Sequence, residues 1–277
     1  MKRELLFPLL ILAGGLLVAA LLPTEPLPWL AGMSPRALLG LLLLILTLQT
    51  LGQVALERLG PQLGLAVAGL ISGLVSSTAT IASMGRHARR EPELAQACAA
   101  GAVMSTAATW LQAFLMLMLL APAAAFAFAP AALAGLLVAG TVGAWLARRS
   151  GKRARVNPRA KRAPLQLRET LLVAGLLLLV ATLVNAAQQR FGSQGLFGAV
   201  ALAGLGDAHA PVATLAALEA SGQIGLQQLQ QGVILAIACN SLSRSLIACI
   251  GGGWAFARWV LMALAGSACA AGLVLLA

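Results

Sequence analysis

The chain of 277 residues is 60% hydrophobic and only 10% charged, with a mean hydropathy of +0.91. A soluble domain carries about a quarter charged residues, so the composition excludes an ordinary soluble protein. The net charge of +11 is not accompanied by interleaved aromatic residues or a recognisable nucleic-acid-binding module, so nucleic acid is not an expected partner. Because the apolar runs are continuous rather than alternating, they predict an all-α polytopic membrane protein embedded in the lipid bilayer, and not a β-barrel.

The predicted elements begin with a leading transmembrane helix at 5–22 and a proline-rich turn, which together form a first region of residues 1–30. Two later segments are rich in small residues and are expected to be discontinuous or re-entrant, because glycine and proline interrupt helices at membrane depth. A polar loop is predicted at 86–93. The small-residue segments are 60–84 and 195–218, and the remaining spans are predicted at 36–54, 95–120, 129–146, 170–187, 229–250 and 254–276.

A basic loop lies near the middle of the chain. Nine of the nineteen Lys and Arg residues fall between Arg148 and Arg168. The positive-inside rule places such a loop on the cytoplasmic side of the membrane. Its charge also makes anionic lipids an expected partner of the Arg148–Arg168 loop.

The sequence on either side of this loop repeats, which divides the chain into repeat 1 (31–147), the basic loop (148–168) and repeat 2 (169–277). When the halves are aligned, Gln53 meets Asn185 and Ser76 meets Asp207. Internal repeats with binding segments at corresponding positions are typical of secondary transporters. Chance alignment of two Leu/Ala-rich stretches is the alternative. The loop charges mildly favour inverted repeats with re-entrant segments, but the length of 60–84 suits one full crossing, so inverted and parallel repeats are about equally favoured.

The segment AGLGDAHAPVATLAAL at 203–218 holds the only aspartate of the chain, Asp207, and one of its two histidines, His209. A carboxylate at membrane depth costs at least about 2–3 kcal/mol, so it usually faces a cavity, a partner or a substrate path. The neighbouring glycines and proline predict an interrupted helix. On a regular helix Asp207 and His209 would not share a face, whereas in an unwound segment both could ligate a metal ion. A pair that only fixes helix packing is the alternative.

Three further groups complete the candidate ion- or substrate-binding site. Asn240 and Arg244 lie on one helix face, and an arginine in mid-span needs a counter-charge, for which Asp207 is the obvious residue. The hydroxyl groups of the SSTAT run could ligand a cation, bind an anion or satisfy carbonyls of their own helix. Two matched amides could bind substrate or only join helices. The groups are Ser76, Ser77, Thr78 and Thr80; Asn240 and Arg244; and Gln53 and Asn185.

Four of these stretches resemble a known family. The runs GLISGLVSSTATIASMGRHAR and GAVMSTAATWLQ, and later GLGDAHAPVATLAAL and ACNSLSR, are similar to a module at the carboxy-terminal end of many MgtC/SapB-type bacterial membrane proteins, the domain of unknown function 4010. The resemblance covers residues 36–276, so the chain looks like the module alone. It implies a bacterial inner-membrane protein and a connection with divalent-cation physiology, and it implies no reaction.

The function expected from these observations is a secondary transporter or channel-like permease for a small ion or solute, bound at mid-membrane between the SSTAT and GDAHAP segments. Oxygen ligands outnumber basic groups there, which slightly favours a cation. In one mechanism Asp207 binds a proton or cation and breaks its pair with Arg244; in the other Arg244 holds an anionic substrate with which Asp207 competes.

The alternative function is a non-transporting membrane regulator or assembly subunit that binds partner helices. Small-residue faces suit such association and also the formation of a homo-oligomer. Soluble catalytic motifs are missing, so we expect neither an enzyme nor a cofactor.

Overall fold

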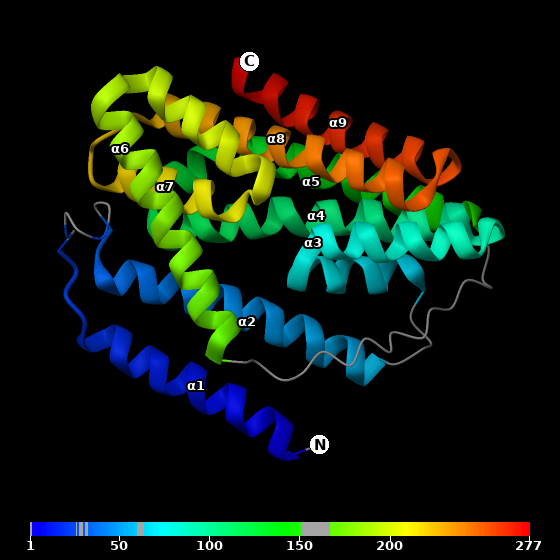
Figure 1. Ribbon diagram of the computed structural model, residues 1–277, viewed down its shortest axis with the longest axis horizontal. Coiled ribbons are helices and arrows are strands. Elements are labelled where there is room, and N and C mark those ends of the chain that lie inside the picture. The colour runs from blue at the N-terminus through cyan, green and yellow to red at the C-terminus, as the bar shows by residue number, and fades with distance from the viewer. Residues whose placement is uncertain (1, 26, 28–29, 31–32, 60–63, 151–166) are drawn as a thin grey trace. The chain divides into compact units, whose positions relative to one another are not determined.

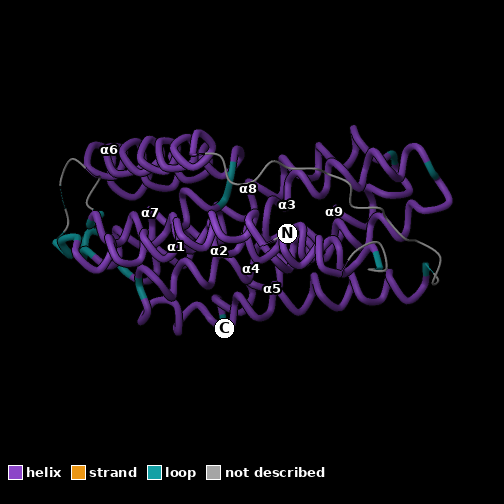
Figure 2. Tube along the Cα trace, turned by 90° about the horizontal axis from the view of Figure 1, so that it is seen from below, coloured by secondary structure: helices purple, strands orange, loops and turns teal. Residues whose placement is uncertain are grey.

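The computed structural model describes residues 2–25, 27, 30, 33–59, 64–150 and 167–277. Within these ranges nearly the whole chain is helical and no strand forms (Figure 1, Figure 2), which confirms the all-α prediction. The elements in chain order are α1 (Lys2–Leu21), α2 (Pro35–Leu59), α3 (Leu65–Arg90), the short 3₁₀ helix η3 (Pro92–Leu94), α4 (Ala95–Leu120), α5 (Pro122–Arg149), α6 (Leu167–Gly206), α7 (His209–Ala220), α8 (Leu226–Gly252) and α9 (Trp254–Leu276).

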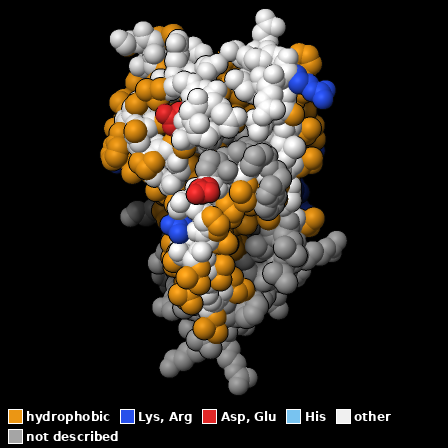
Figure 3. Space-filling view, turned by 90° about the vertical axis from the view of Figure 1, so that its left-hand side faces the viewer, with side chains coloured by type: hydrophobic (Ala, Val, Ile, Leu, Met, Phe, Trp, Pro, Cys, Tyr) orange, Lys and Arg blue, Asp and Glu red, His pale blue; other side chains and the backbone are white. Residues whose placement is uncertain are grey.

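Six segments of the described chain are long and apolar enough to cross a membrane. The face shown in Figure 3 carries many hydrophobic side chains and only scattered charged ones, as expected of a surface in lipid. The protein is therefore a multi-pass membrane protein. The segments are Pro35–Leu56, Leu65–Arg90, Pro92–Leu120, Pro122–Arg149, Leu226–Gly252 and Trp254–Leu276.

Several boundaries differ from the sequence-based ones. The polar loop predicted at 86–93 is wrong over its first part, because α3 continues as a helix to Arg90. Basic side chains in the last turn interact favourably with the negative end of the helix dipole, which favours this continuation. The predicted basic loop also begins too early: α5 continues through Arg148 to Arg149, and Arg168 already lies in α6. Residues 151–166 of that loop lie outside the described residues.

The helix α6 joins what the sequence separates into two segments. Its backbone leaves the helical region only at Gly192, with φ 58° and ψ −142°, and Figure 1 shows that the ribbon turns back on itself along α6. Glycine reaches this left-handed φ without the steric cost that a Cβ brings. The segment predicted at 195–218 is thus divided between the end of α6 and α7, as expected of a discontinuous segment.

The chain forms two compact units, each built from three separate stretches. Because these units interleave, they do not follow the boundaries of the two predicted repeats, and the repeats stay a prediction. The first unit comprises Met1–Thr50, Leu115–Ala127 and Ala160–Ala236; the second comprises Leu51–Phe114, Phe128–Arg159 and Ile237–Ala277.

In the first unit, Met33, Ala181 and Ala217 form a small buried cluster. Arg36 at the start of α2 donates from Nη2 to the carbonyl oxygens of Ala20 and Leu22, at 2.9 and 2.8 Å. These bonds satisfy carbonyl groups at the end of α1, which a helix terminus leaves without internal partners.

In the second unit, α3 and α4 approach each other closely along small residues. A Cβ on Gly73 would lie 2.7 Å from Ser105 Cα, and one on Gly69 would collide with the Gly101 backbone. Small residues at such contacts let two backbones approach, so that short polar side chains of one helix reach the other. This approach positions the polar cluster described next.

A polar cluster around a broken helix

The backbone of α3 leaves the helical region at Ser76, where φ is −166° and ψ is 107°. Ser76 Oγ accepts a hydrogen bond from the Ala79 amide at 3.3 Å, so its side chain caps the second half of α3. The Thr80 hydroxyl donates to the Ser76 carbonyl oxygen at 2.8 Å. The hydroxyl groups of Ser76 and Thr80 therefore satisfy backbone groups of their own helix at the break. This is one of the roles that the sequence allows for them.

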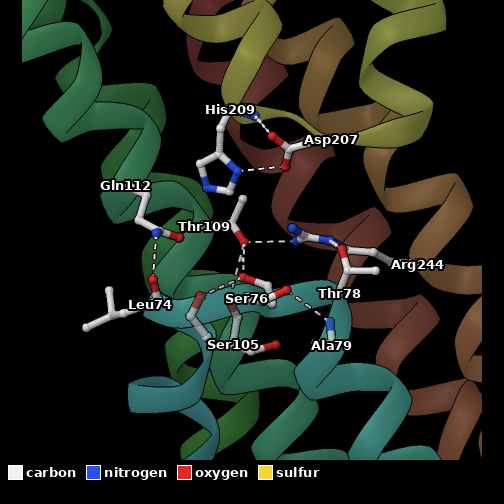
Figure 4. Close-up of polar contacts among 12 residues, drawn as sticks. Leu74, Ser76, Thr78, Ala79, Ser105, Thr109, Gln112, Asp207, His209 and Arg244 are labelled. Carbon is white, nitrogen blue, oxygen red and sulfur yellow. Dashed lines mark hydrogen bonds and ion pairs between the residues drawn. The ribbon is translucent and has the colours of Figure 1, made fainter. Parts of the chain in front are cut away.

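Gln112 on α4 stabilises the other side of the break. Its side-chain amide donates to the carbonyl oxygen of Leu74 at 3.0 Å (Figure 4), and the residue is only 4% exposed. A helix break frees carbonyl groups that cost free energy when buried without a partner. Gln112 thus removes part of that cost with a side chain from the neighbouring helix.

Arg244 on α8 contacts the same place. Its Nη1 donates to Thr109 Oγ1 on α4 at 2.8 Å, and its Nε donates to Thr78 Oγ1 at 3.3 Å (Figure 4). Thr109 also lies 2.9 Å from Ser77 Oγ, so one hydroxyl joins three helices. Arg244 is 2% exposed. The guanidinium is therefore buried and oriented at the first turn of the second half of α3, where the positive end of a helix dipole lies.

Asn240 lies one turn before Arg244 on α8 and is also 2% exposed. Its side-chain Nδ2 has no hydrogen-bond partner among the described residues. A buried amide donor without a partner costs about 1–3 kcal/mol, and a bound water or ion is one way in which such a group is satisfied. Residues four apart lie on one helix face, so this donor is on the same side of α8 as Arg244.

In the first unit, Asp207 and His209 form a local pair. The predicted interruption is confirmed, because α6 ends at Gly206 and α7 begins at His209. Asp207 Oδ1 lies 2.7 Å from His209 Nδ1, and Oδ2 accepts from the His209 amide at 3.1 Å (Figure 4). The unwound segment thus brings together two side chains that a regular helix would separate.

The pair of Asp207 and His209 is less buried than Arg244 and Asn240. The Asp207 side chain is 39% exposed and that of His209 is 20% exposed. Within the described ranges, no third His, Cys, Asp or Glu joins them in a group suited to a metal ion. Metal ligation by Asp207 and His209 stays a prediction. The predicted pair of Asp207 with Arg244 also stays a prediction, because these residues belong to different units.

The two matched amides occupy different surroundings. Asn185 on α6, in the first unit, accepts from Gln189 Nε2 at 3.3 Å and is 8% exposed. Gln53 on α2, in the second unit, is half-buried next to Gly52, where a Cβ would lie 2.9 Å from the Ile71 carbonyl oxygen. Gln53 therefore comes directly after the residue of α2 that packs closely on the first half of α3.

The structure brings five of the predicted site residues into one cluster in the second unit and adds two that sequence reasoning missed. Sequence reasoning missed Thr109 and Gln112 because neither side chain carries a charge. The signal that could have revealed them is the run of polar residues on α4 at positions 105, 109 and 112, spaced to follow one helix face. The cluster comprises Ser76, Ser77, Thr78, Thr80 and Arg244 with Thr109 and Gln112.

No curated protein and no solved structure matches the chain. One family model does match, that of the domain of unknown function DUF4010, and it covers residues 43–252. The matched region includes the whole of α3, α4 and α8, and therefore every residue of the Arg244 cluster. The chain belongs to the DUF4010 family of membrane proteins.

Proposed function

We propose that this protein is a permease, either a secondary transporter or a channel-like protein, for a small anionic solute that binds at Arg244. The observation that carries the proposal is a buried guanidinium held by two threonine hydroxyls at a helix break, within helices long enough to cross a membrane. Charged residues inside membrane helices usually mark a substrate path. Broken helices whose amino-terminal ends face an anionic group are a common construction in secondary transporters.

The donors at this place favour an anion over a cation. The sequence favours a cation by its count of oxygen atoms, but the hydroxyls of Ser76 and Thr80 are bonded to the backbone and side chains of their own helix. The groups that remain characteristic of the site are the Arg244 guanidinium and the Asn240 amide donor. An arginine fork binds carboxylate, sulfate-like and phosphate groups through parallel hydrogen bonds.

The orientation that we propose follows from the basic side chains of the second unit. Arg89 and Arg90 end α3, Arg149 ends α5, and Arg258 lies in the first turns of α9. The contact between Trp145 and Trp259, 5.4 Å between ring centroids, places the end of α5 beside the start of α9. By the positive-inside rule this end is cytoplasmic in a bacterial inner membrane. That the chain is related to MgtC/SapB-type proteins is part of this proposal, and the resemblance of its motifs supports it.

A thermal-stability screen of the purified protein in detergent tests the proposal. The probes are sodium salts of chloride, sulfate, phosphate, acetate and glutamate, with MgCl₂ and NaCl to separate cation from anion effects. We expect one anion to raise the melting temperature of the wild type by several degrees, because a ligand at about 100 times its Kd stabilises by about 2.7 kcal/mol. The Arg244→Gln variant should lose this shift and Arg258→Gln should retain it.

Uptake into liposomes of the anion so identified then distinguishes a permease from a regulator. Wild type should accelerate uptake and Arg244→Gln should not. Stabilisation by Mg²⁺ independent of the anion would contradict the anion assignment. Anion binding without any flux would contradict the permease and favour the regulatory or assembly subunit.

A further inference from the structure

A second place in the molecule has the features of a binding site, and it lies nearer the ends of α3 and α8 than the Arg244 cluster does. A pocket of about 450 Å³ lies in the second unit between the end of α3 and the end of α8. This volume is within the range of small-molecule sites. Its lining includes three basic and two branched apolar side chains: Arg86, Arg89, Arg90, Ile247 and Ile250, with Gly251.

The three arginines concentrate positive charge in a small volume. Each is exposed, and none forms an ion pair or a side-chain hydrogen bond with any residue in the described part of the chain. The nearest carboxylates in sequence, Glu91 and Glu93, are exposed and do not pair with them. Three guanidinium groups on one pocket wall repel one another unless an anion lies between them, so this wall suits a phosphate.

The part of the lining that α8 contributes is apolar. Ile250 is 64% exposed, at the end of a helix that is long enough to cross the membrane. The close approach of Gly85 to Gly251 and Gly252, where a Cβ on Gly85 would lie 3.1 Å from the Gly252 nitrogen, holds the two walls together. A ligand here meets arginines on one side and hydrocarbon-like side chains on the other.

Neighbouring side chains mark this end of the second unit as the membrane–water boundary. Arg149 lies over the Trp145 ring at 4.3 Å, and Arg258 lies over the Trp259 ring at 5.1 Å. Tryptophan and arginine together are typical of the head-group level of a bilayer. The pocket is therefore at the depth where lipid phosphates are found.

We propose that this pocket binds the phosphate of an anionic phospholipid, with an acyl chain along Ile247 and Ile250. Basic pockets between membrane helices on the cytoplasmic side recognise lipid head groups through the same chemistry. A soluble phosphate would share the arginine contacts but would leave the apolar wall unused. The inference does not depend on the proposed transport function, because it concerns different residues and a different ligand.

The test uses the full chain, purified in detergent and freed of bound lipid. Its melting temperature is measured with phosphatidylglycerol, with phosphatidylcholine, with glycerol 3-phosphate and with sodium phosphate at equal concentrations. We expect phosphatidylglycerol to raise the melting temperature by several degrees and the other three to have little effect. Replacement of Arg86, Arg89 and Arg90 by Gln should weaken the apparent affinity for phosphatidylglycerol at least roughly tenfold.

A matched triple variant separates the pocket from general surface charge. This control variant replaces Arg148, Arg149 and Arg258 by Gln. It removes the same charge from the same end of the second unit but leaves the pocket lining intact, so it should bind phosphatidylglycerol as the wild type does. Ile250→Ser should weaken phosphatidylglycerol binding and leave the response to glycerol 3-phosphate unchanged. Equal loss in both triple variants would overturn the pocket assignment. A full response to sodium phosphate would overturn the lipid assignment in favour of a soluble anion.

Discussion

At the break in α3, the carbonyl oxygens of Ser76 and Leu74 accept hydrogen bonds from the Thr80 hydroxyl and the Gln112 amide. The buried Arg244 donates to Thr78, at the start of the second half of the helix. At Asp207, between α6 and α7, a carboxylate instead accepts from the first amide of the next helix and pairs with the imidazole of His209. The side chains that reach the first break from other helices are buried, with Arg244 2% and Gln112 4% exposed, whereas the Asp207 side chain is 39% exposed.

The difference shows two ways to satisfy a broken membrane helix. At the second break, the Asp207 carboxylate accepts the first amide of the following helix directly. The break at Ser76 depends on α4 and α8, and the guanidinium beside it belongs to Arg244, which follows its partner Thr78 by 166 residues in the chain. A break that is completed by other helices responds to movements of those helices, which is a property that a transport site requires.

The largest effect is expected from loss of the Arg244 guanidinium at the break in α3. Arg244→Gln should reduce uptake of the stabilising anion at least roughly tenfold, because the bidentate donor is removed. Asp207→Asn should reduce it less, since an asparagine oxygen still accepts from the His209 amide. Liposome flux of the two variants, corrected for the amount of folded protein, makes the comparison. Equal losses would show that both breaks act in one site.

The next largest effect is expected from disturbing the close packing of α3 on α4 beside the break at Ser76. Gly73→Ala places a Cβ 2.7 Å from Ser105 Cα, so α3 and α4 must separate at a cost of about 1–3 kcal/mol. We expect a lower melting temperature and a weaker anion response. Gly140→Ala in α5 is the matched control, because no atom lies within 4 Å of its added Cβ. A stable Gly73→Ala protein with full anion binding would show that close contact is not needed.

A smaller effect separates the two threonines that hold Arg244. Thr109→Val removes a 2.8 Å bond to Nη1 and the contact with Ser77, whereas Thr78→Val removes only the 3.3 Å bond to Nε. Stability should fall by about 1–2 kcal/mol in the first variant and by about 0.5 kcal/mol in the second. Thermal melting of both variants measures the order, and the reverse order would contradict the geometry.

A loss of stability of similar size is expected at the second break. Asp207→Ala removes the acceptor for the His209 amide and should cost about 1 kcal/mol, the usual value for a lost helix cap. Asp207→Asn should cost less, because its amide oxygen keeps the bond. Melting curves of both variants provide the check. A loss of several kcal/mol in Asp207→Asn would mean that the charge itself stabilises the fold.

Much of the candidate site could be predicted from the sequence because charge and small residues are rare signals in an apolar chain. Asp207, His209 and Arg244 stand out for that reason, and the interruption around Asp207 follows from its glycines and proline. Thr109 and Gln112 could not be identified in the same way, because their importance comes from α4 lying against the break in α3. Helix ends such as Arg86–Arg90 were misjudged because charged residues there read equally as a loop or as the last turn of a helix.

The sequence by itself determined that this is a helical membrane protein, since composition and continuous apolar runs leave no other solution for buried backbone groups. It also determined where the small-residue helix before His209 is interrupted. Only the tertiary structure decided that the guanidinium of Arg244 lies at Thr78 and Thr109, and that three arginines and two isoleucines share one pocket. Such contacts depend on how closely separate helices pack, and the glycines at those positions fix that distance only once the helices are in place.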